Sequence, residues 1–381
     1  MTSNLTIYFV FSSVNVRPAG GHMLFCVPTN TKSSRATETI DTMIEKTNKS
    51  HQGIARWIVV AAKPVPLFPL DISSVYIHFD AAIVASRIDE NLRLRSVEVT
   101  FDSKNAEATC KTSNFLEYKI SLFAGDDGVS THVEIIRIHG CGFAMKAERE
   151  AIINAAKGLG TTLGTTMRPP KLVLSIPDEL KSLYKPPSRS ELESTLNRAI
   201  DNFHSINRRN VLFALDNLAA ITNANKAHTE TAHQMSKLIM QNECDARDFI
   251  LAIYFAKDQN EFSCCVNEQI KHSCLTIILQ GLEYLSSKQS GFLDETYDEF
   301  VGKLMPQLIE DIRECKCSGI HNSCLALKCL YLILSNSSRA SECAEDYNMR
   351  DVVMQAEQCG RREHMNLEQI AKSTIGLLTV N

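Results

Sequence analysis

The stretch "FLEYKISLFAGDDGVSTHVEIIRIHG" (residues 115–140) decides the fold of the first half of the chain. Its first nine residues alternate, with Leu116, Tyr118, Ile120 and Leu122 opposite Glu117, Lys119 and Ser121. This period of two is typical of a strand with one buried face. The following "GDDG" (125–128) predicts a hairpin turn. The second strand places Val133 and Ile135 inward but loses its alternation at Ile136, which a bulge or burial on both faces would explain.

Two shorter alternating runs precede this hairpin, "SVEVTF" (96–101) and "AEATCK" (106–111). Apolar residues at helical spacing flank the four strands. Before them come Ile77, Ala81, Val84, Ala85 and Ile88, and after them Met145, Arg149, Ile152, Ile153 and Ala156. The expected order is α-β-β-β-β-α, a small antiparallel sandwich of helices packed on a sheet.

The segment "FLEYKISLFAGDDGVSTHVEIIRIHGCGFAMKAEREAIINAA" resembles the C-terminal kinase-associated domain. The similar features are Leu122-Phe123 at a strand end, Val133-Glu134 after the turn, then Arg137, Gly140, Phe143 and a closing helix. The resemblance covers about 90 of the 381 residues and includes no catalytic motif. It implies a module that binds acidic lipids or partner proteins, or that holds an adjoining kinase inactive.

A lipid site of that kind needs exposed basic residues. The region from Glu90 to Lys157 contains nine Lys and Arg against ten Asp and Glu, so it has no positive surplus. Four basic residues could still gather on one surface: Lys119, Arg137, Lys146 and Arg149. A solvated charged face is the simpler interpretation.

"GLGTTLGTTMRPP" (158–170) resembles a dinucleotide-binding glycine pattern in its Gly158, Gly160 and Gly164. That mechanism needs the glycines to follow a strand and open a helix, whereas these follow a predicted helix and lead into two prolines. We therefore expect no cofactor here. The segment 158–189 is predicted to be a linker, with one short helix over Pro177–Leu183.

From Ser190 onward the strand signal disappears. Ser190 and Glu193 have the spacing of a capping box, which predicts the first helix. Three lines then superpose: "ALDNLAAIT" (214–222), "ILQGLEYLS" (278–286) and "ALKCLYLIL" (326–334), and "AKSTIGLLTV" ends the chain in similar style. Steps of 64 and 48 residues between the lines resemble armadillo and HEAT repeats, which run at ~40–47 residues. Stacks of such repeats present a long surface that binds other proteins.

A cysteine-rich stretch, "ECKCSGIHNSCLALKC" (314–329), raises the question of a metal site. Its candidate ligands are Cys315, Cys317, His321 and Cys324. Structural zinc sites usually have C-x2–4-C pairs with a second pair well separated, and this stretch lacks them. Because Cys324 and Cys329 fall within an apolar helical pattern, we expect core thiols and no metal.

No motif in the chain indicates catalysis. The histidines at 204, 228, 233 and 272 are predicted to lie on polar helix faces without a nucleophile beside them. The acidic run "DETYDE" (294–299) has no recognised ligand spacing and suits a helix start. Because no catalytic motif occurs, we expect no enzyme, with no catalytic, cofactor or metal residues. An enzyme is a third class of function, and it would need a cleft with perturbed carboxylates or histidines.

Charge and cysteine usage limit the partners. From Ser190 to the end the chain has 18 Lys and Arg against 26 Asp and Glu, which argues against nucleic-acid binding there. Thirteen cysteines, mostly within apolar helical patterns, favour a reducing compartment, and we expect a cytoplasmic protein. No run reaches the ~18 apolar residues that a membrane span needs. Residues 1–50 are predicted to be a loosely ordered extension.

The sequence thus predicts a multidomain α+β and all-α protein. Residues 51–157 form the α-β4-α module, 158–189 the linker, and 190–381 an armadillo-like helical stack. The expected function is that of a non-catalytic scaffold that binds a partner protein through the helical surface. The alternative is a regulatory or targeting subunit whose α-β4-α module docks on a kinase-like enzyme or on acidic phospholipid.

Overall fold

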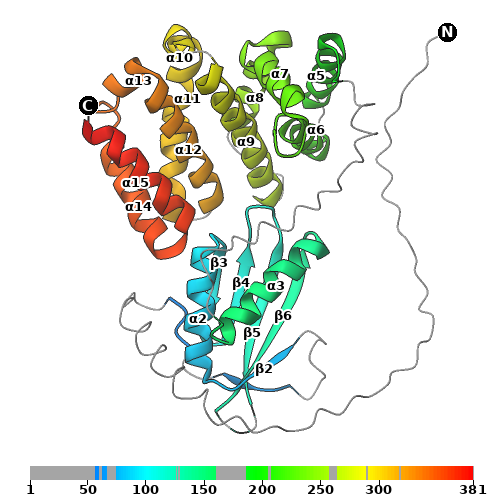
Figure 1. The fold of residues 1–381 in the computed structure, drawn as a ribbon, viewed down its shortest axis with the longest axis vertical. Coiled ribbons are helices and arrows are strands. Elements are labelled where there is room, and N and C mark those ends of the chain that lie inside the picture. Colours follow the sequence, from blue (N-terminus) through cyan, green and yellow to red (C-terminus); the bar gives the residue numbers. More distant parts are fainter. Residues whose placement is uncertain are drawn as a thin grey trace, which may run out of the picture. The chain divides into compact units, whose positions relative to one another are not determined.

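In the computed structural model, the sheet of the first half is antiparallel and built around the quoted hairpin (Figure 1). Its strands are β1 (Lys63–Pro64), β2 (Val75–Ile77), β3 (Glu98–Asp102), β4 (Glu107–Lys111), β5 (Glu117–Ala124) and β6 (Thr131–His139). They lie in the order β2-β6-β5-β4-β3, and β1 adds a short parallel pairing with the end of β5. The four strands expected from the alternation are confirmed, and β1 and β2 are additions.

The alternation of β6 fails at Ile136, an apolar residue on the exposed face that pairs in regular register with Lys119, so the bulge of this strand lies after the failure and does not cause it. Glu117 pairs with His139 while Tyr118 pairs with Arg137, so β6 contains one residue more than β5 at this point. The extra residue is Ile138, two positions after the residue at which the alternation fails. The bulge lies at the end of the sheet, where Ile136 and Ile138 are both partly exposed.

Two helices pack on the sheet, α2 (Ala81–Leu94) and α3 (Gly142–Ala156). The prediction that Ile77 belongs to the first helix is wrong: it lies in β2, paired with Thr131. Asp80 follows β2 and is the N-cap residue of α2. Its carboxylate accepts a hydrogen bond from Ala82 N at 2.8 Å. The core between helices and sheet includes the chain's single tryptophan, Trp57, which stacks on Phe101.

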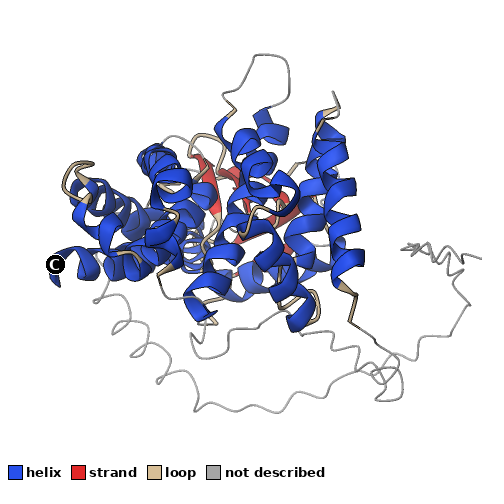
Figure 2. Cartoon of the chain, turned by 90° about the horizontal axis from the view of Figure 1, so that it is seen from above, coloured by secondary structure: helices blue, strands red, loops and turns tan. Residues whose placement is uncertain are grey.

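The second half is helical. It contains α5 (Arg189–Phe203), α6 (Arg208–Ile221), α7 (Thr229–Met240), η1 (Glu243–Asp245), α8 (Ala246–Phe255), α9 (Cys264–Lys288), α10 (Phe292–Glu295), η2 (Tyr297–Val301), α11 (Gly302–Arg313), η3 (Glu314–Lys316), α12 (Ile320–Asn336), α13 (Ser338–Glu342), α14 (Met349–Glu363) and α15 (Met365–Val380). In Figure 2 the strands (red), which form one sheet, lie together among the helices (blue).

The superposable lines occupy helices that pack side by side. They lie in α6, α9 and α12, and the closing line lies in α15; α6 packs on α9, α9 on α12, and α12 on α15. A second set of helices backs this row, with α5 on α6, α8 on α9, α11 on α12 and α14 on α15. The matched leucines Leu215, Leu279 and Leu327 are all buried. This stacking of helix pairs is compatible with helical repeats.

The first helix of this half begins two residues before the predicted position. Ser188, not Ser190, is the N-cap residue, and its hydroxyl accepts from Glu191 N while Glu191 binds Ser188 N at 2.7 Å. Both serines have Glu three residues later, so spacing alone could not distinguish them. The capping box of Ser188 leaves Arg189 as the first helical residue.

The structure describes residues 56–59, 62–66, 74–125, 127, 129–159, 186–204, 207–256, 264–288, 291–316 and 319–380. The predicted extension (1–50), the short helix over Pro177–Leu183 and most of the linker lie outside these residues. We call the described residues of 56–159 the sheet module and those of 186–380 the helical stack. Both belong to one compact unit, Ile54–Asn381.

Candidate functional site

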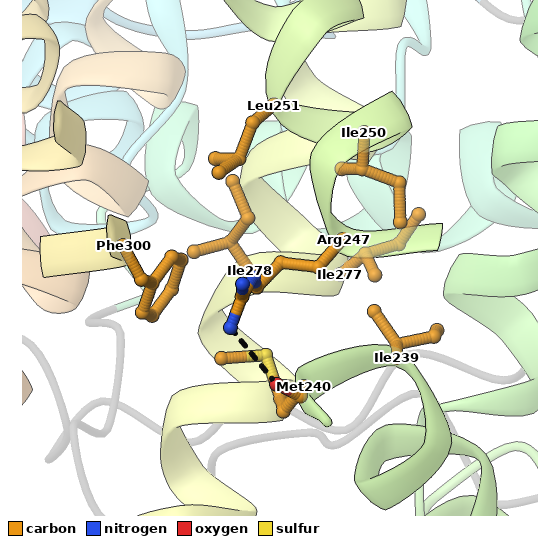
Figure 3. Close-up of a pocket in the computed structure, with 8 residues that line it drawn as sticks. All are labelled: Ile239, Met240, Arg247, Ile250, Leu251, Ile277, Ile278 and Phe300. Atoms are coloured by element: carbon orange, nitrogen blue, oxygen red, sulfur yellow. Dashed lines mark hydrogen bonds between the residues drawn. The ribbon is translucent and has the colours of Figure 1, made fainter. Parts of the chain in front are cut away.

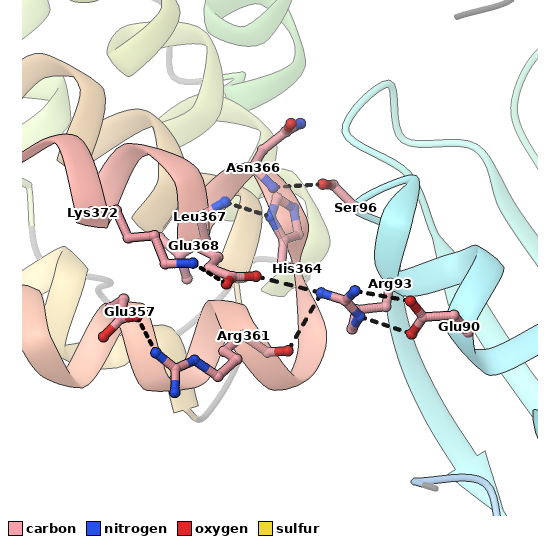
Figure 4. Close-up of polar contacts among 10 residues, drawn as sticks. All are labelled: Glu90, Arg93, Ser96, Glu357, Arg361, His364, Asn366, Leu367, Glu368 and Lys372. Carbon is pink, nitrogen blue, oxygen red and sulfur yellow. Dashed lines mark hydrogen bonds and ion pairs between the residues drawn. The ribbon is translucent and has the colours of Figure 1, made fainter. Parts of the chain in front are cut away.

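The sheet module and the helical stack meet at a polar junction (Figure 4). Ser96 follows α2, and its hydroxyl accepts a hydrogen bond from Asn366 N in the first turn of α15 at 2.9 Å. Arg93, held by two bonds of 2.9 Å to Glu90, also lies 3.4 Å from Glu368 and donates to Arg361 O at 3.4 Å. The end of α2 therefore contacts the corner between α14 and α15.

Two histidines continue the junction. Leu367 N donates to His364 Nδ1 at 3.2 Å, and His364 Nε2 lies 3.3 Å from His321 Nδ1. His321 Nε2 then lies 3.0 Å from Lys111 O in β4. The three contacts form a line from α15 through α12 to the sheet module, which we call the histidine relay.

Both histidines of the relay are buried. Desolvation lowers the pKa of His364 to about 3, and the neighbouring His321 adds to this effect. Desolvation also lowers the pKa of His321, although the hydrogen bond to Lys111 O works in the opposite direction. Both imidazoles are therefore neutral at pH 7.

Charged groups of the two parts lie beside the relay. Lys111 of β4 forms an ion pair with Glu268 of α9. Glu98 of β3 lies close to them and to the backbone of Gly319, where α12 begins. Burial raises the pKa of Glu98, the negative charge of Glu268 raises it further, and Lys111 opposes both.

An open cleft of about 540 Å³ lies next to these charges. Its lining comes from both parts of the molecule: Asn114, Phe115, His139, Gly140, Asp216 and Gln269. Phe115 holds a positive φ of 55°, rare for an aromatic residue, and its ring meets His272 edge-on with the centroids 4.9 Å apart. Strained backbone at a cleft is typical of functional sites.

His272 is half-buried, so the prediction of a polar surface position is wrong for this histidine. Its Nδ1 lies 3.1 Å from Asn322 Oδ1, and Asn322 in turn donates to Glu268 O at 3.3 Å. Desolvation lowers the pKa of His272 to about 4. His204 lies at the exposed end of α5, and His228 precedes α7.

The row of helices α6, α9 and α12 presents matched side chains to solvent. The superposed lines put Asp216, Gln280 and Lys328 at one equivalent position, and all three are exposed or half-buried. Ser273 donates to Asp216 at 2.6 Å, and Glu283 lies near Lys328. Burial raises the pKa of Glu283, and the charge of Lys328 opposes the shift. We call the strip formed by Asp216, Gln280, Glu283 and Lys328 the row surface.

A small cavity inside the stack is too narrow for a ligand (Figure 3). Its volume of about 10 Å³ suits a single water molecule. Seven of the eight lining residues are apolar, and the eighth is Arg247, whose guanidinium donates to Met240 O at 3.3 Å. Arg247 thus satisfies a carbonyl at the end of α7, which is a structural role.

The cysteine-rich stretch does not converge on one point. Cys315 is buried beside Cys359, whose thiol donates to Cys315 O at 3.2 Å. His321 belongs to the relay, Cys324 is buried in α12, and Cys317 lies outside the described residues. Within the described ranges no group of three or more His, Cys, Asp or Glu could hold a metal ion.

The four basic residues considered for a lipid site lie on two faces. Lys119 pairs with Glu107 at 2.8 Å and lies across from Ile136, on the face of the sheet opposite to Arg137. Arg137 donates to Gly140 O, and Arg149 donates to Ile135 O. Lys146 is exposed on α3, next to the strongly exposed Phe143.

The acidic run "DETYDE" stabilises neighbouring structure. Asp294 accepts hydrogen bonds from Ser338 and from Arg339 N at the start of α13. Asp298 forms a double hydrogen bond with the guanidinium of Arg339. These contacts account for both carboxylates without a cation.

Comparison with known proteins finds no match: no family model fits the sequence, and no curated protein or solved structure is significantly similar to it. Among the helices that the structure describes, none is long and apolar enough to cross a membrane.

Proposed function

We propose that this chain is a non-catalytic interaction protein whose row surface binds an extended peptide segment of a partner protein in the cytoplasm. The observation that carries the proposal is that Asp216, Gln280 and Lys328, none of them buried, occupy matched positions of the superposable lines on three neighbouring helices. Helix axes pack roughly 8–10 Å apart, so an extended peptide that crosses the row meets a new helix about every three residues. Such spacing suits hydrogen bonds to a peptide backbone that crosses the helices.

Further observations support an armadillo-like stack, a peptide partner and a reducing compartment in this proposal. The four superposable lines occupy one row of neighbouring helices, and a second row backs them. The exposed Phe213 lies three residues before Asp216 on α6. An apolar side chain of a bound peptide could pack against it. Among the cysteines whose side chains the structure describes, none forms a disulfide, which suits a reducing compartment.

The test is a pulldown with the full chain and quantitative mass spectrometry. The variant Asp216→Ala/Gln280→Ala/Lys328→Ala removes the polar groups of the row surface. The matched control Arg350→Ala/Met354→Ala/Gln358→Ala changes three exposed residues of α14, in the second row. We expect the row variant to lose the partner more than tenfold while the control retains it. Equal retention by both variants would contradict the proposal.

The exposed side chain of Phe143 favours a second candidate function. It is 86% exposed at the start of α3, with Ile138 47% exposed nearby in sequence, Arg137 six residues before it and Lys146 three residues after it. An apolar tip beside basic residues suits docking on acidic phospholipid. Vesicles of phosphatidylcholine with 20–30% phosphatidylserine (roughly the anionic range for such tests) should then bind the full chain at low salt. Phe143→Ala should abolish that binding, and Phe213→Ala should not.

A further inference from the structure

The hydrogen bonds of the relay fix the position of every proton in it. A backbone N–H can only donate, so His364 Nδ1 is the acceptor for Leu367 N. Neutral His364 therefore has its proton on Nε2, which it donates to His321 Nδ1. Neutral His321 then has its proton on Nε2 and donates it to Lys111 O. The relay is complete when each histidine is neutral and in the Nε2–H tautomer.

No position in the relay remains for an additional proton. A proton on His364 Nδ1 would face the N–H of Leu367, and a proton on His321 Nδ1 would face the N–H of His364. Each would replace a hydrogen bond by two opposed donors in a buried site. We propose that His321 and His364 form an acid-sensitive latch, which holds the sheet module on the helical stack when neutral and releases it when protonated.

The surroundings of the relay contain charges of both signs. The titratable and charged groups near it are Lys111 and Glu98 on the strands, Glu268 and His272 on α9, Lys328 on α12, Glu363 at the end of α14, and Arg93 and Glu368 at the adjoining contact. Glu268 is the nearest anion that would favour a protonated His321, and its ion pair with Lys111 offsets it. Desolvation also lowers the pKa of His272, so this histidine is neutral as well.

The size of the effect follows from the ordinary pKa of histidine. In an open state that solvates both imidazoles, each has a pKa near 6.5, whereas desolvation lowers the pKa of both in the closed state. At pH 5, each histidine that the closed state keeps neutral raises the ratio of open to closed molecules about 30-fold. Two such histidines raise it about 1000-fold.

Amide hydrogen exchange at Asn366 measures the latch directly. This amide lies in the first turn of α15, where N–H groups have no partner within the helix, and it donates across the junction to Ser96. Its protection therefore depends on the closed junction. In the full chain we expect exchange at Asn366 to accelerate at least 30-fold from pH 7.5 to pH 5, after correction for the intrinsic pH dependence of amide exchange. The amides of Ile120 and Leu122, within β5, should keep their protection.

Two results would overturn the latch. Unchanged protection of Asn366 at pH 5 would show that the junction does not respond to protons. An equal loss at Ile120 and Leu122 would show general unfolding of the sheet module.

A double variant gives an independent check. In His321→Gln/His364→Asn, the Gln amide can donate to Lys111 O and the Asn carbonyl can accept from Leu367 N, but neither titrates. Its Asn366 exchange should not accelerate in acid, whereas the control His204→Gln should behave like the wild type. A double variant with the wild-type response contradicts the proposal. If that variant does not fold, the wild-type comparison of Asn366 with β5 still decides.

Discussion

Gly360 lies at the closest approach between α14 and α15. A Cβ added there would lie 2.3 Å from Glu368 N and 2.9 Å from Leu367 C, both backbone atoms that cannot turn aside. Gly360→Ala should therefore lower the free energy of unfolding by about 3 kcal/mol, measured by urea denaturation. Gly376→Ala is the matched control in α15, where nothing lies within 4 Å, and should stabilise by about 0.5–1 kcal/mol. Equal effects of the two would show that the helices are not in contact at Gly360.

Asp311 is a buried carboxylate with an ion pair, and its side chain has no exposed surface. It accepts from the hydroxyl of Tyr254 at 2.6 Å and pairs with Lys271 at 2.7 Å. Asp311→Ala should cost about 3–5 kcal/mol of stability, because both partners lose their acceptor inside the stack. Glu310→Ala, one residue away and mostly exposed, should change stability by less than about 0.5 kcal/mol. Both variants remove one negative charge, so the difference between their melting temperatures measures the effect of burial.

Among the elements, the start of α5 tests the correction of the predicted capping box. Ser188→Ala removes the hydroxyl that accepts from Glu191 N and should cost about 1 kcal/mol in the urea unfolding curve. Ser190→Ala should have little effect, although Ser190 has the same spacing to a glutamate. A larger loss from Ser190→Ala would restore the original prediction.

The strands and helices were predictable because their signal is local. Alternation in residues 116–122 and helical spacing around Leu215 depend on neighbours a few positions away. Ile77 was misassigned because it fits the helical spacing of α2 by coincidence, although the capping Asp80 separates it from that helix. Asp80, a short polar residue before the apolar pattern, is the local signal that marks the start of α2.

The junction could not be predicted in the same way. His321 and Lys111 are 210 positions apart, and nothing in their local sequence relates one to the other. His272 and His364 stand among polar residues, so their local sequence predicts exposed side chains. Their burial depends on contacts between segments far apart in the chain, which is a tertiary effect.

At the scale of the whole molecule, the junction should make the two parts unfold together. Trp57 is the chain's single tryptophan and is buried in the sheet module, so its fluorescence reports that module alone. Far-ultraviolet circular dichroism reports mainly the helical stack. At pH 7.5 we expect the two urea transitions to coincide, as in a two-state protein. Separate midpoints would show that the junction does not couple the parts.

Acid should weaken the folded state as a whole. His272, His321 and His364 all have lowered pKa values in the folded protein, so the unfolded chain binds more protons between about pH 6.5 and pH 4. The free energy of unfolding must then fall as the pH falls through this range. Urea midpoints at pH 7.5, 6.5 and 5.5 should decrease in that order. A flat or rising series would mean that these imidazoles are not buried.

The contact between Ser96 and Asn366 joins residues 270 positions apart. A ribosome adds roughly 5–20 residues per second, so it completes α15 roughly 15 to 50 s after the turn that follows α2. The sheet module has time to fold long before the surface that receives it exists. Its polar rim, which includes Lys111 and Glu98, must remain soluble throughout that interval. A ribosome that stalls before α15 would leave a folded module with no place to dock.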